Sequence, residues 1–182
     1  MVDIVNVVAS GYIGREFDLV ALQADLSTYE KVYEPERFPG LQLRFEEEGA
    51  VLILYSTGAY SIMGAKSEED LERIYNAFAR AMNKIDIDIM ILDKGPEIQN
   101  LICKANLEQE VDLSALTIGL GLESVEYEPG QSPFLYYWPE EVDCLITIPT
   151  NGEVIITGVK VEEQAERAFA HLQNRIDELF HK

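Results

Sequence analysis

Residues 4–8 read Ile-Val-Asn-Val-Val, and residues 98–102 read Ile-Gln-Asn-Leu-Ile. The same offset of 94 residues aligns residues 3–88 with residues 97–182 without a gap. The aligned identities include Asp18-Leu19 with Asp112-Leu113, Tyr33-Glu34-Pro35 with Tyr127-Glu128-Pro129, Pro39 with Pro133, and Gly58 with Gly152. Two repeats are too few for a solenoid, so the alignment predicts two copies of one unit related by pseudo-two-fold symmetry.

Each copy is predicted to contain a strand, a short helix, several strands and a long helix. Asp18 and Asp112 are suited to cap the short helices, and Ser67 to cap the first long helix. Apolar residues at helical spacing follow Ser67 and recur one repeat later. The predicted strands are 4–10, 41–45, 51–56 and 59–63, then 98–104, 135–138, 144–148 and 153–157; the predicted helices are 18–26, 67–85, 112–122 and 161–180. We expect the first repeat to span residues 1–92 and the second residues 93–182, together forming one domain.

Composition limits the function classes. The chain has 182 residues, 47% of them hydrophobic, and a net charge of −19, so we expect a packed core and not a disordered chain. The acidity argues against binding that relies mainly on phosphate neutralisation. Two cysteines, no apolar run of membrane-spanning length and no basic-then-apolar N-terminal signal lead us to expect a cytoplasmic protein.

The repeat also predicts a binding surface. One amphipathic helix per copy covers only one face of a sheet. The other face is then left open, and an open face with apolar residues is typical of a binding surface.

The motifs resemble those of the TATA-box-binding protein family, particularly its archaeal members, over essentially the whole chain. The stretches that carry the resemblance are Ile4–Ser10, Tyr33–Leu41, Met63–Glu69, Ile118–Pro129 and Ile156–Lys160. The resemblance implies an α+β saddle in which two pseudo-symmetric repeats form a curved, ten-stranded antiparallel sheet. It places DNA on the concave face and the helices on the convex side. It also implies that apolar wedges kink the DNA in its minor groove.

The resemblance assigns roles to particular residues. An A·T minor groove offers only hydrogen-bond acceptors and a smooth floor, so its reader needs amide donors and apolar contacts. Asn6 and Asn100 are then the central amides, and Phe38 and Tyr55 the wedge pair of the first repeat. The other implied DNA contacts are Val8, Arg44, Ile53, Ile102, Ile155 and Thr157, and the implied contacts for transcription factor B are Tyr127 and Glu128.

The second repeat departs from this pattern. Ser132 and Pro149 stand where the first repeat has Phe38 and Tyr55, and neither supplies an aromatic ring. Glu153 would face phosphates with the wrong charge. We therefore expect that changing Ser132 to Phe, Pro149 to Phe and Glu153 to Lys strengthens DNA binding. Phe134 is either a wedge shifted by two residues or an aromatic that packs locally or touches another protein, and the sequence favours the second interpretation.

Two functions remain open. The first is a transcription initiation factor that binds the A·T-rich minor groove of promoter DNA and recruits transcription factor B and RNA polymerase. The second is a diverged paralogue with weakened DNA binding that regulates transcription through protein contacts. A homodimer formed through the open sheet face is a further expectation. We expect neither a cofactor nor enzymatic activity, because His171 and His181 lack a metal-ligand cluster and no nucleophile motif is present.

Overall fold

The computed structural model describes residues 1–180, and its contacts divide the chain into two compact units. We call Asn6–Gln99 the N-terminal unit, and Met1–Val5 together with Asn100–Lys182 the C-terminal unit. The sequence repeat places its boundary at residues 92 and 93, and that boundary remains a prediction. No helix among the described residues is long and apolar enough to span a membrane.

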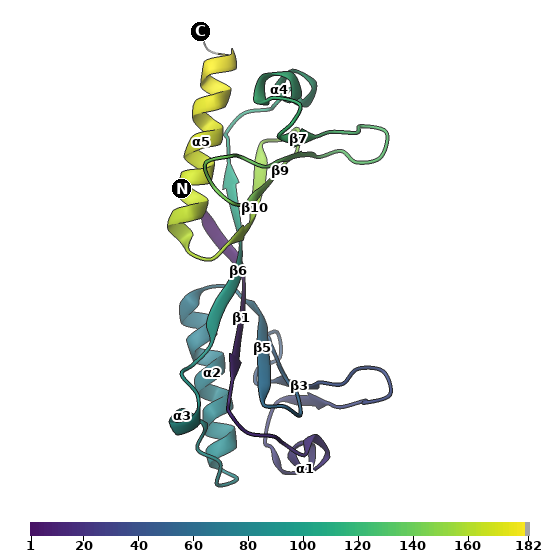
Figure 1. Ribbon diagram of the computed structural model, residues 1–182, viewed down its shortest axis with the longest axis vertical. Helices are drawn as coiled ribbons and strands as arrows, with labels where there is room; N and C mark the ends of the chain where they lie inside the picture. Colours follow the sequence, from purple (N-terminus) through teal and green to yellow (C-terminus); the bar gives the residue numbers. More distant parts are fainter. Residues whose placement is uncertain (181–182) are drawn as a thin grey trace. The chain divides into compact units, whose positions relative to one another are not determined.

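The N-terminal unit contains an antiparallel sheet with strand order β2-β3-β4-β5-β1. Its elements are β1 (Asp3–Tyr12, in this unit from Asn6), α1 (Leu19–Asp25), β2 (Glu30–Val32), β3 (Leu41–Arg44), β4 (Val51–Leu54), β5 (Ala59–Ala65), α2 (Glu68–Asn83) and α3 (Ile89–Leu92). The long helix α2 runs along one side of this sheet (Figure 1).

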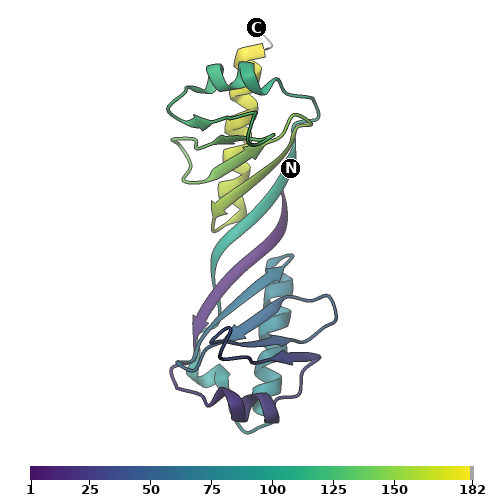
Figure 2. The same ribbon diagram turned by 90° about the vertical axis from the view of Figure 1, so that its right-hand side faces the viewer.

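The C-terminal unit repeats the arrangement, with strand order β6-β10-β9-β8-β7. Its elements are β6 (Glu97–Asn106, in this unit from Asn100), α4 (Leu113–Leu120), β7 (Val125–Glu126), β8 (Leu135–Tyr137), β9 (Leu145–Ile148), β10 (Glu153–Val159) and α5 (Glu162–Phe180). Figure 2 shows α5 behind the strands of this unit.

Alternating burial explains why each sheet has a covered and an open face. Along β5, Tyr60 and Ile62 are buried, whereas Ser61 and Met63 between and after them are not. The same alternation occurs in β10, where Val154 and Ile156 are buried. Because neighbouring side chains of a strand point to opposite faces, each sheet buries one face against its helices and leaves the other face without a helix.

The predicted helices and caps agree with the structure. Asp18 Oδ1 accepts hydrogen bonds from the backbone N–H groups of Val20 and Ala21, and Asp112 does the same for the two N–H groups at the start of α4. Ser67 Oγ accepts from the N–H of Asp70 at the start of α2. The apolar residues predicted to recur at helical spacing in the second long helix lie on α5. Five of them are buried, namely Ala165, Ala168, Phe169, Leu172 and Ile176, and the sixth, Leu179, is 38% exposed. These caps satisfy backbone donors that the first turn of a helix leaves unpaired.

A part-buried group of hydrogen bonds lies beside the core of the N-terminal unit. Asp93 Oδ2 accepts hydrogen bonds from the hydroxyls of Tyr60 at 2.6 Å and Tyr75 at 2.8 Å. Burial raises the pKa of both tyrosines well above the usual value, and the hydrogen bond to Asp93 adds to the effect. The segment that follows α2 is thereby tied to the sheet.

Candidate nucleic-acid interface

Three of the predicted DNA contacts lie on one face of the N-terminal sheet. Val8 pairs with Met63, Ile53 pairs with Ser61, and Arg44 pairs with Val51 across neighbouring strands. We call the helix-free sides of the two sheets the open faces, and this one is formed by Val8, Ser10, Gln42, Arg44, Val51, Ile53, Ser61 and Met63. Ile53 is only 7% exposed, so it supports the surface from below and offers little area of its own.

The two aromatic rings predicted to act as wedges lie close to each other and to Gly40. The rings of Phe38 and Tyr55 are 6.2 Å apart between centroids and tilted by 58°. A Cβ atom on Gly40 would stand 2.5 Å from Cγ2 of Ile53. It would also stand 2.8 Å from Cε1 of Phe38 and 3.3 Å from Cε1 of Tyr55. The absence of a side chain at Gly40 therefore lets the two half-buried rings close over Ile53.

Asn100 is held so that its amide donors are available. Its Oδ1 accepts a hydrogen bond of 2.8 Å from the backbone N–H of Gly158, where the pairing of β6 with β10 shifts register. With the oxygen engaged, the NH2 group is the part left for a ligand, and minor-groove acceptors require a donor. Asn6 is half-buried in β1 next to a similar register shift between Val7 and Val8.

Arg44 has a mixed environment. Its Nε lies 3.2 Å from a carboxylate oxygen of Glu30, and its NH1 donates a 2.9 Å hydrogen bond to the backbone oxygen of Gly49. Glu30 and Arg44 are also cross-strand partners of β2 and β3. The carboxylate offsets part of the positive charge that a phosphate would otherwise meet.

The C-terminal unit brings the remaining apolar contacts together. Ile102 pairs with Thr157 across β6 and β10, and Ile155 pairs with Thr147 on β9. Thr147 in turn pairs with Tyr136 on β8. These residues form the open face of this unit together with Leu145 and Lys104.

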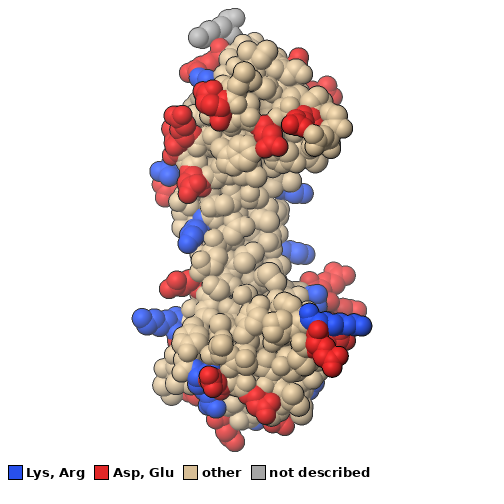
Figure 3. Space-filling model, turned by 45° about the vertical axis from the view of Figure 1, so that its right-hand side comes forward, with Lys and Arg blue, Asp and Glu red and all other residues tan. Residues whose placement is uncertain are grey.

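Charge differs along this surface. Glu153 is exposed at the start of β10, opposite Asn106. Lys104 lies on the same face, opposite Ile155. In the view of Figure 3, acidic side chains predominate on the C-terminal unit, while basic and acidic side chains are mixed on the N-terminal unit. The charge pattern therefore favours phosphate contact on the N-terminal unit.

The predicted partner residues lie on a projecting loop between β7 and β8 (Figure 1). Glu128 is exposed and Tyr127 is half-buried. The backbone oxygen of Glu128 accepts from the N–H groups of Gln131 and Ser132, both at 2.9 Å, which closes the loop. The loop of the first repeat is closed in the same way by Glu34.

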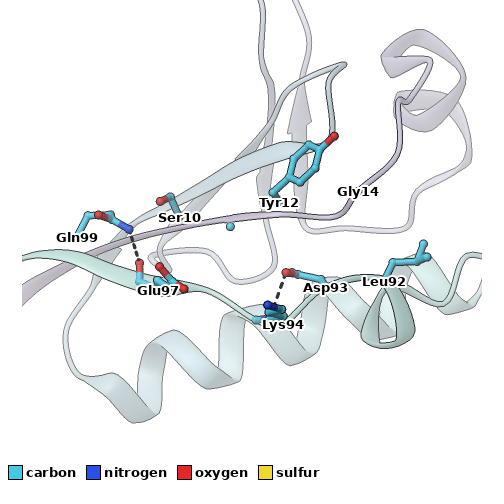
Figure 4. A pocket seen from close by; sticks show the side chains of 10 residues that line it. Ser10, Tyr12, Gly14, Leu92, Asp93, Lys94, Glu97 and Gln99 are labelled. Atoms are coloured by element: carbon cyan, nitrogen blue, oxygen red, sulfur yellow. Dashed lines mark hydrogen bonds between the residues drawn. The ribbon is translucent and has the colours of Figure 1, made fainter.

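One hollow lies in the N-terminal unit and shares Ser10 with its open face. It has a volume of about 510 Å3 and is bordered by the end of β1 and by residues 92–99. Figure 4 shows Ser10 and Tyr12 on one side of it and Asp93 and Lys94 on the other. Asp93 is already engaged by two tyrosine hydroxyls and by the N–H of Gly95, so we assign this hollow a structural role.

The two cysteines and His171 have structural environments. Cys103 and Cys144 are buried and free, and burial raises the pKa of each thiol to about 11. His171 Nε2 lies 2.8 Å from the hydroxyl of Tyr137. Among residues 1–180, no group of three or more His, Cys, Asp or Glu side chains is arranged to hold a metal ion; His181 lies outside the described residues.

Comparison with known proteins identifies the family of this chain. The family model described as "Transcription factor TFIID (or TATA-binding protein, TBP)" matches residues 1–85 and 95–179. The chain therefore belongs to the TATA-box-binding protein family, whose members are DNA-binding transcription factors and not enzymes.

The chain is similar to archaeal TATA-box-binding proteins over almost its full length. The chain is 40% identical over 178 residues to TATA-box-binding protein C of Halobacterium salinarum, covering 98% of both chains. It is 33% identical to the TATA-box-binding protein of Methanothrix thermoacetophila, covering 98% of this chain and 96% of the relative. The solved structure of Methanococcus jannaschii TBP superposes with a TM-score of 0.85 at 34% identity, covering 97% of this chain and 98% of the other. The predicted α+β fold of this family is thus confirmed.

Proposed function

We propose that the chain is a promoter-binding initiation factor that grips the minor groove of A·T-rich DNA with the open faces of its sheets. The observation that carries the proposal is the Phe38–Tyr55 pair over Gly40, a surface aromatic pair fixed above a buried Ile53. An aromatic ring that enters a base step must be held in place before binding, or ordering it would cost free energy. Family membership and the name of each relative supply the DNA target.

The amides and apolar contacts complete the proposed reader. Asn100 presents its NH2 group because Gly158 holds its oxygen. Val8, Ile102, Ile155 and Thr157 offer half-buried apolar area beside it. Amide donors with smooth apolar neighbours suit the acceptors and flat floor of A·T pairs. We assign Asn6 the matching role in the first repeat.

The second part of the proposal concerns protein partners. The loop bearing Tyr127 and Glu128 is closed by its own backbone hydrogen bonds, so it presents a fixed surface to transcription factor B, which would then recruit RNA polymerase. Such a factor acts at promoters, so we place the protein on the chromosome in the archaeal cytoplasm. Without DNA, the apolar open face is also the surface through which we expect two copies to associate.

A specific observation favours a second candidate function. The C-terminal unit carries Ser132 and Pro149 in place of the aromatic pair, and Glu153 is exposed on its open face. A diverged paralogue that binds DNA weakly and regulates transcription through protein contacts would have such a surface. The two candidates differ in whether A·T-rich DNA is bound preferentially.

A gel-shift titration with a TATA duplex and a scrambled duplex at the same salt concentration separates them. The proposed function predicts a clear preference for the TATA duplex, and a supershift when transcription factor B is added. Changing Tyr127 to Ala and Glu128 to Arg should abolish the supershift and leave the binary complex intact. The matched control changes Tyr33 and Glu34, the equivalents in the first repeat, and should retain both bands. Equal affinity for the two duplexes would favour the paralogue.

A further inference from the structure

Phe134 occupies an unusual position on the C-terminal unit. It directly precedes β8, and its ring is 37% exposed. The next residues alternate, with Leu135 and Tyr137 buried and Tyr136 half-buried on the open face. The alternation of β8, extended by one residue toward its N-terminus, leads us to expect Phe134 on the same side as Tyr136.

The first repeat explains why an aromatic residue fits there. Phe134 is the counterpart of Gly40, whose missing side chain makes room for Phe38, Ile53 and Tyr55. A Cβ atom at that place is incompatible with Ile53 and Phe38 in their present positions and makes a tight contact with Tyr55.

In the second repeat all three neighbours have changed together. The counterparts of the crowding residues are Ser132, Thr147 and Pro149, none of which carries a large side chain. The large side chains that crowd Gly40 thus have only smaller counterparts in the second repeat. One aromatic ring stands two residues after the position of the lost Phe38 counterpart, which gives the shifted-wedge interpretation a physical basis.

The segment is also held in place. Ser132 Oγ accepts a hydrogen bond of 3.3 Å from the backbone N–H of Phe134 and lies 3.2 Å from the hydroxyl of Tyr136. The serine that replaces the wedge thus bridges the two aromatic residues that follow it. These contacts hold the backbone at Phe134, which limits the directions its ring can take before a ligand arrives.

We propose that Phe134 is the base-stacking contact of the C-terminal unit, replacing the aromatic pair used in the N-terminal unit. The inference rests on the proposed function, because the ligand is the A·T-rich duplex bound there. Apolar rings inserted at a base step unstack it, and every base offers a face to such a ring. A protein partner on the same ring is the competing outcome.

The test uses a symmetric A·T-rich duplex with 2-aminopurine at the step near each end, so that its fluorescence rises when either step is unstacked. The full-length natural protein should give the full rise. Phe134→Ala and Phe38→Ala should each lose a clear part of it and bind about 10-fold more weakly, and the double variant should lose nearly all of it. Phe134→Tyr should restore the signal. The matched control is Phe180→Ala, an aromatic of similar exposure on α5, which should behave as the natural protein.

Circular dichroism and thermal melting must show that every variant is folded. If Phe134→Ala does not fold, Phe134→Tyr still tests the inference, because it keeps an aromatic ring at this position and should give the fluorescence rise of the natural protein. Suppose that Phe38→Ala loses the whole signal while Phe134→Ala matches Phe180→Ala. The inference is then wrong and the proposed function stands. Loss of the factor B supershift in Phe134→Ala, with an unchanged fluorescence signal, would also overturn it in favour of a protein contact. If the natural protein shows no preference for the A·T duplex, both proposals fail.

Discussion

Adding a single methyl group at Gly40 tests the geometry of the aromatic pair. In Gly40→Ala the new Cβ would lie 2.5 Å from Cγ2 of Ile53, about 0.9 Å short of the 3.4 Å at which ordinary contact begins. Ile53 is 7% exposed and has little room to move. Phe38 and Tyr55 are half-buried, so their rings are the groups that should yield.

The magnitude follows from the cost of overpacking. Extra methyl groups in a packed site cost about 1–3 kcal/mol. Rings that swing outward relieve part of this cost, so the free energy of unfolding should fall by about 1 kcal/mol. The displaced rings no longer match a base step, and a loss of about 1.4 kcal/mol in binding is a factor of about 10 in affinity. We therefore expect at least this loss for a TATA duplex.

Two assays measure the effect, namely urea unfolding followed by circular dichroism and fluorescence anisotropy with a labelled TATA duplex. The matched control is Gly130→Ala, because a Cβ on Gly130 meets nothing within 4 Å. That variant should change neither stability nor affinity. If Gly40→Ala binds the duplex as tightly as Gly130→Ala does, the rings of Phe38 and Tyr55 do not form the contact, and our account of the site is refuted.

Three further predictions concern the second repeat, pH and salt. The aromatic pair of the first repeat requires a glycine at position 40, and the triple change predicted from the sequence leaves Phe134 at the equivalent position. We therefore expect a variant that also changes Phe134 to glycine to bind a TATA duplex at least 10-fold more tightly in anisotropy titrations. An unchanged affinity would contradict this. The changes in this variant are Ser132→Phe, Phe134→Gly, Pro149→Phe and Glu153→Lys. Raising the pH above about 9 should lower the free energy of unfolding measured in urea titrations. Folding raises the pKa values of the two buried cysteines and of Tyr60 and Tyr75, so these groups ionise at lower pH in the unfolded chain than in the folded protein. Constant stability up to pH 11 would contradict this. Finally, with 14 Lys and Arg against 33 Asp and Glu, we expect the protein to neutralise few DNA phosphates. The logarithm of affinity should then fall with the logarithm of salt concentration less steeply than for proteins with roughly 6–10 phosphate contacts, and a slope as steep as theirs would be inconsistent with a mainly apolar contact.

Much of the fold was accessible from the sequence because its signals are local or repeated. The gapless repeat predicted two like units, and the apolar spacing after Ser67 predicted α2 within two residues at its C-terminal end. The pattern of residues does not predict three of the elements, namely the strands β2 and β7 and the helix α3. They have three, two and four residues, which is too short for a periodic signal.

The site depended on contacts that local patterns do not encode. Phe38 and Tyr55 were named through resemblance, whereas the role of Gly40 became visible only when separate strands were brought together. The bond between Asn100 and Gly158 joins residues 58 positions apart at a register shift. The one available sequence signal for Gly40 was its replacement by Phe134 in the second repeat, alongside the loss of both aromatic partners.

The proposed function requires that the open faces bind and bend A·T-rich DNA. It is tested most directly by energy transfer between dyes at the two ends of a TATA duplex, titrated with the natural protein beside a scrambled duplex of equal length. Our account predicts saturation of the TATA duplex at a concentration at least 10-fold lower, with increased transfer that Phe38→Ala reduces. Equal saturation of both duplexes, or binding without any change in transfer, would contradict it.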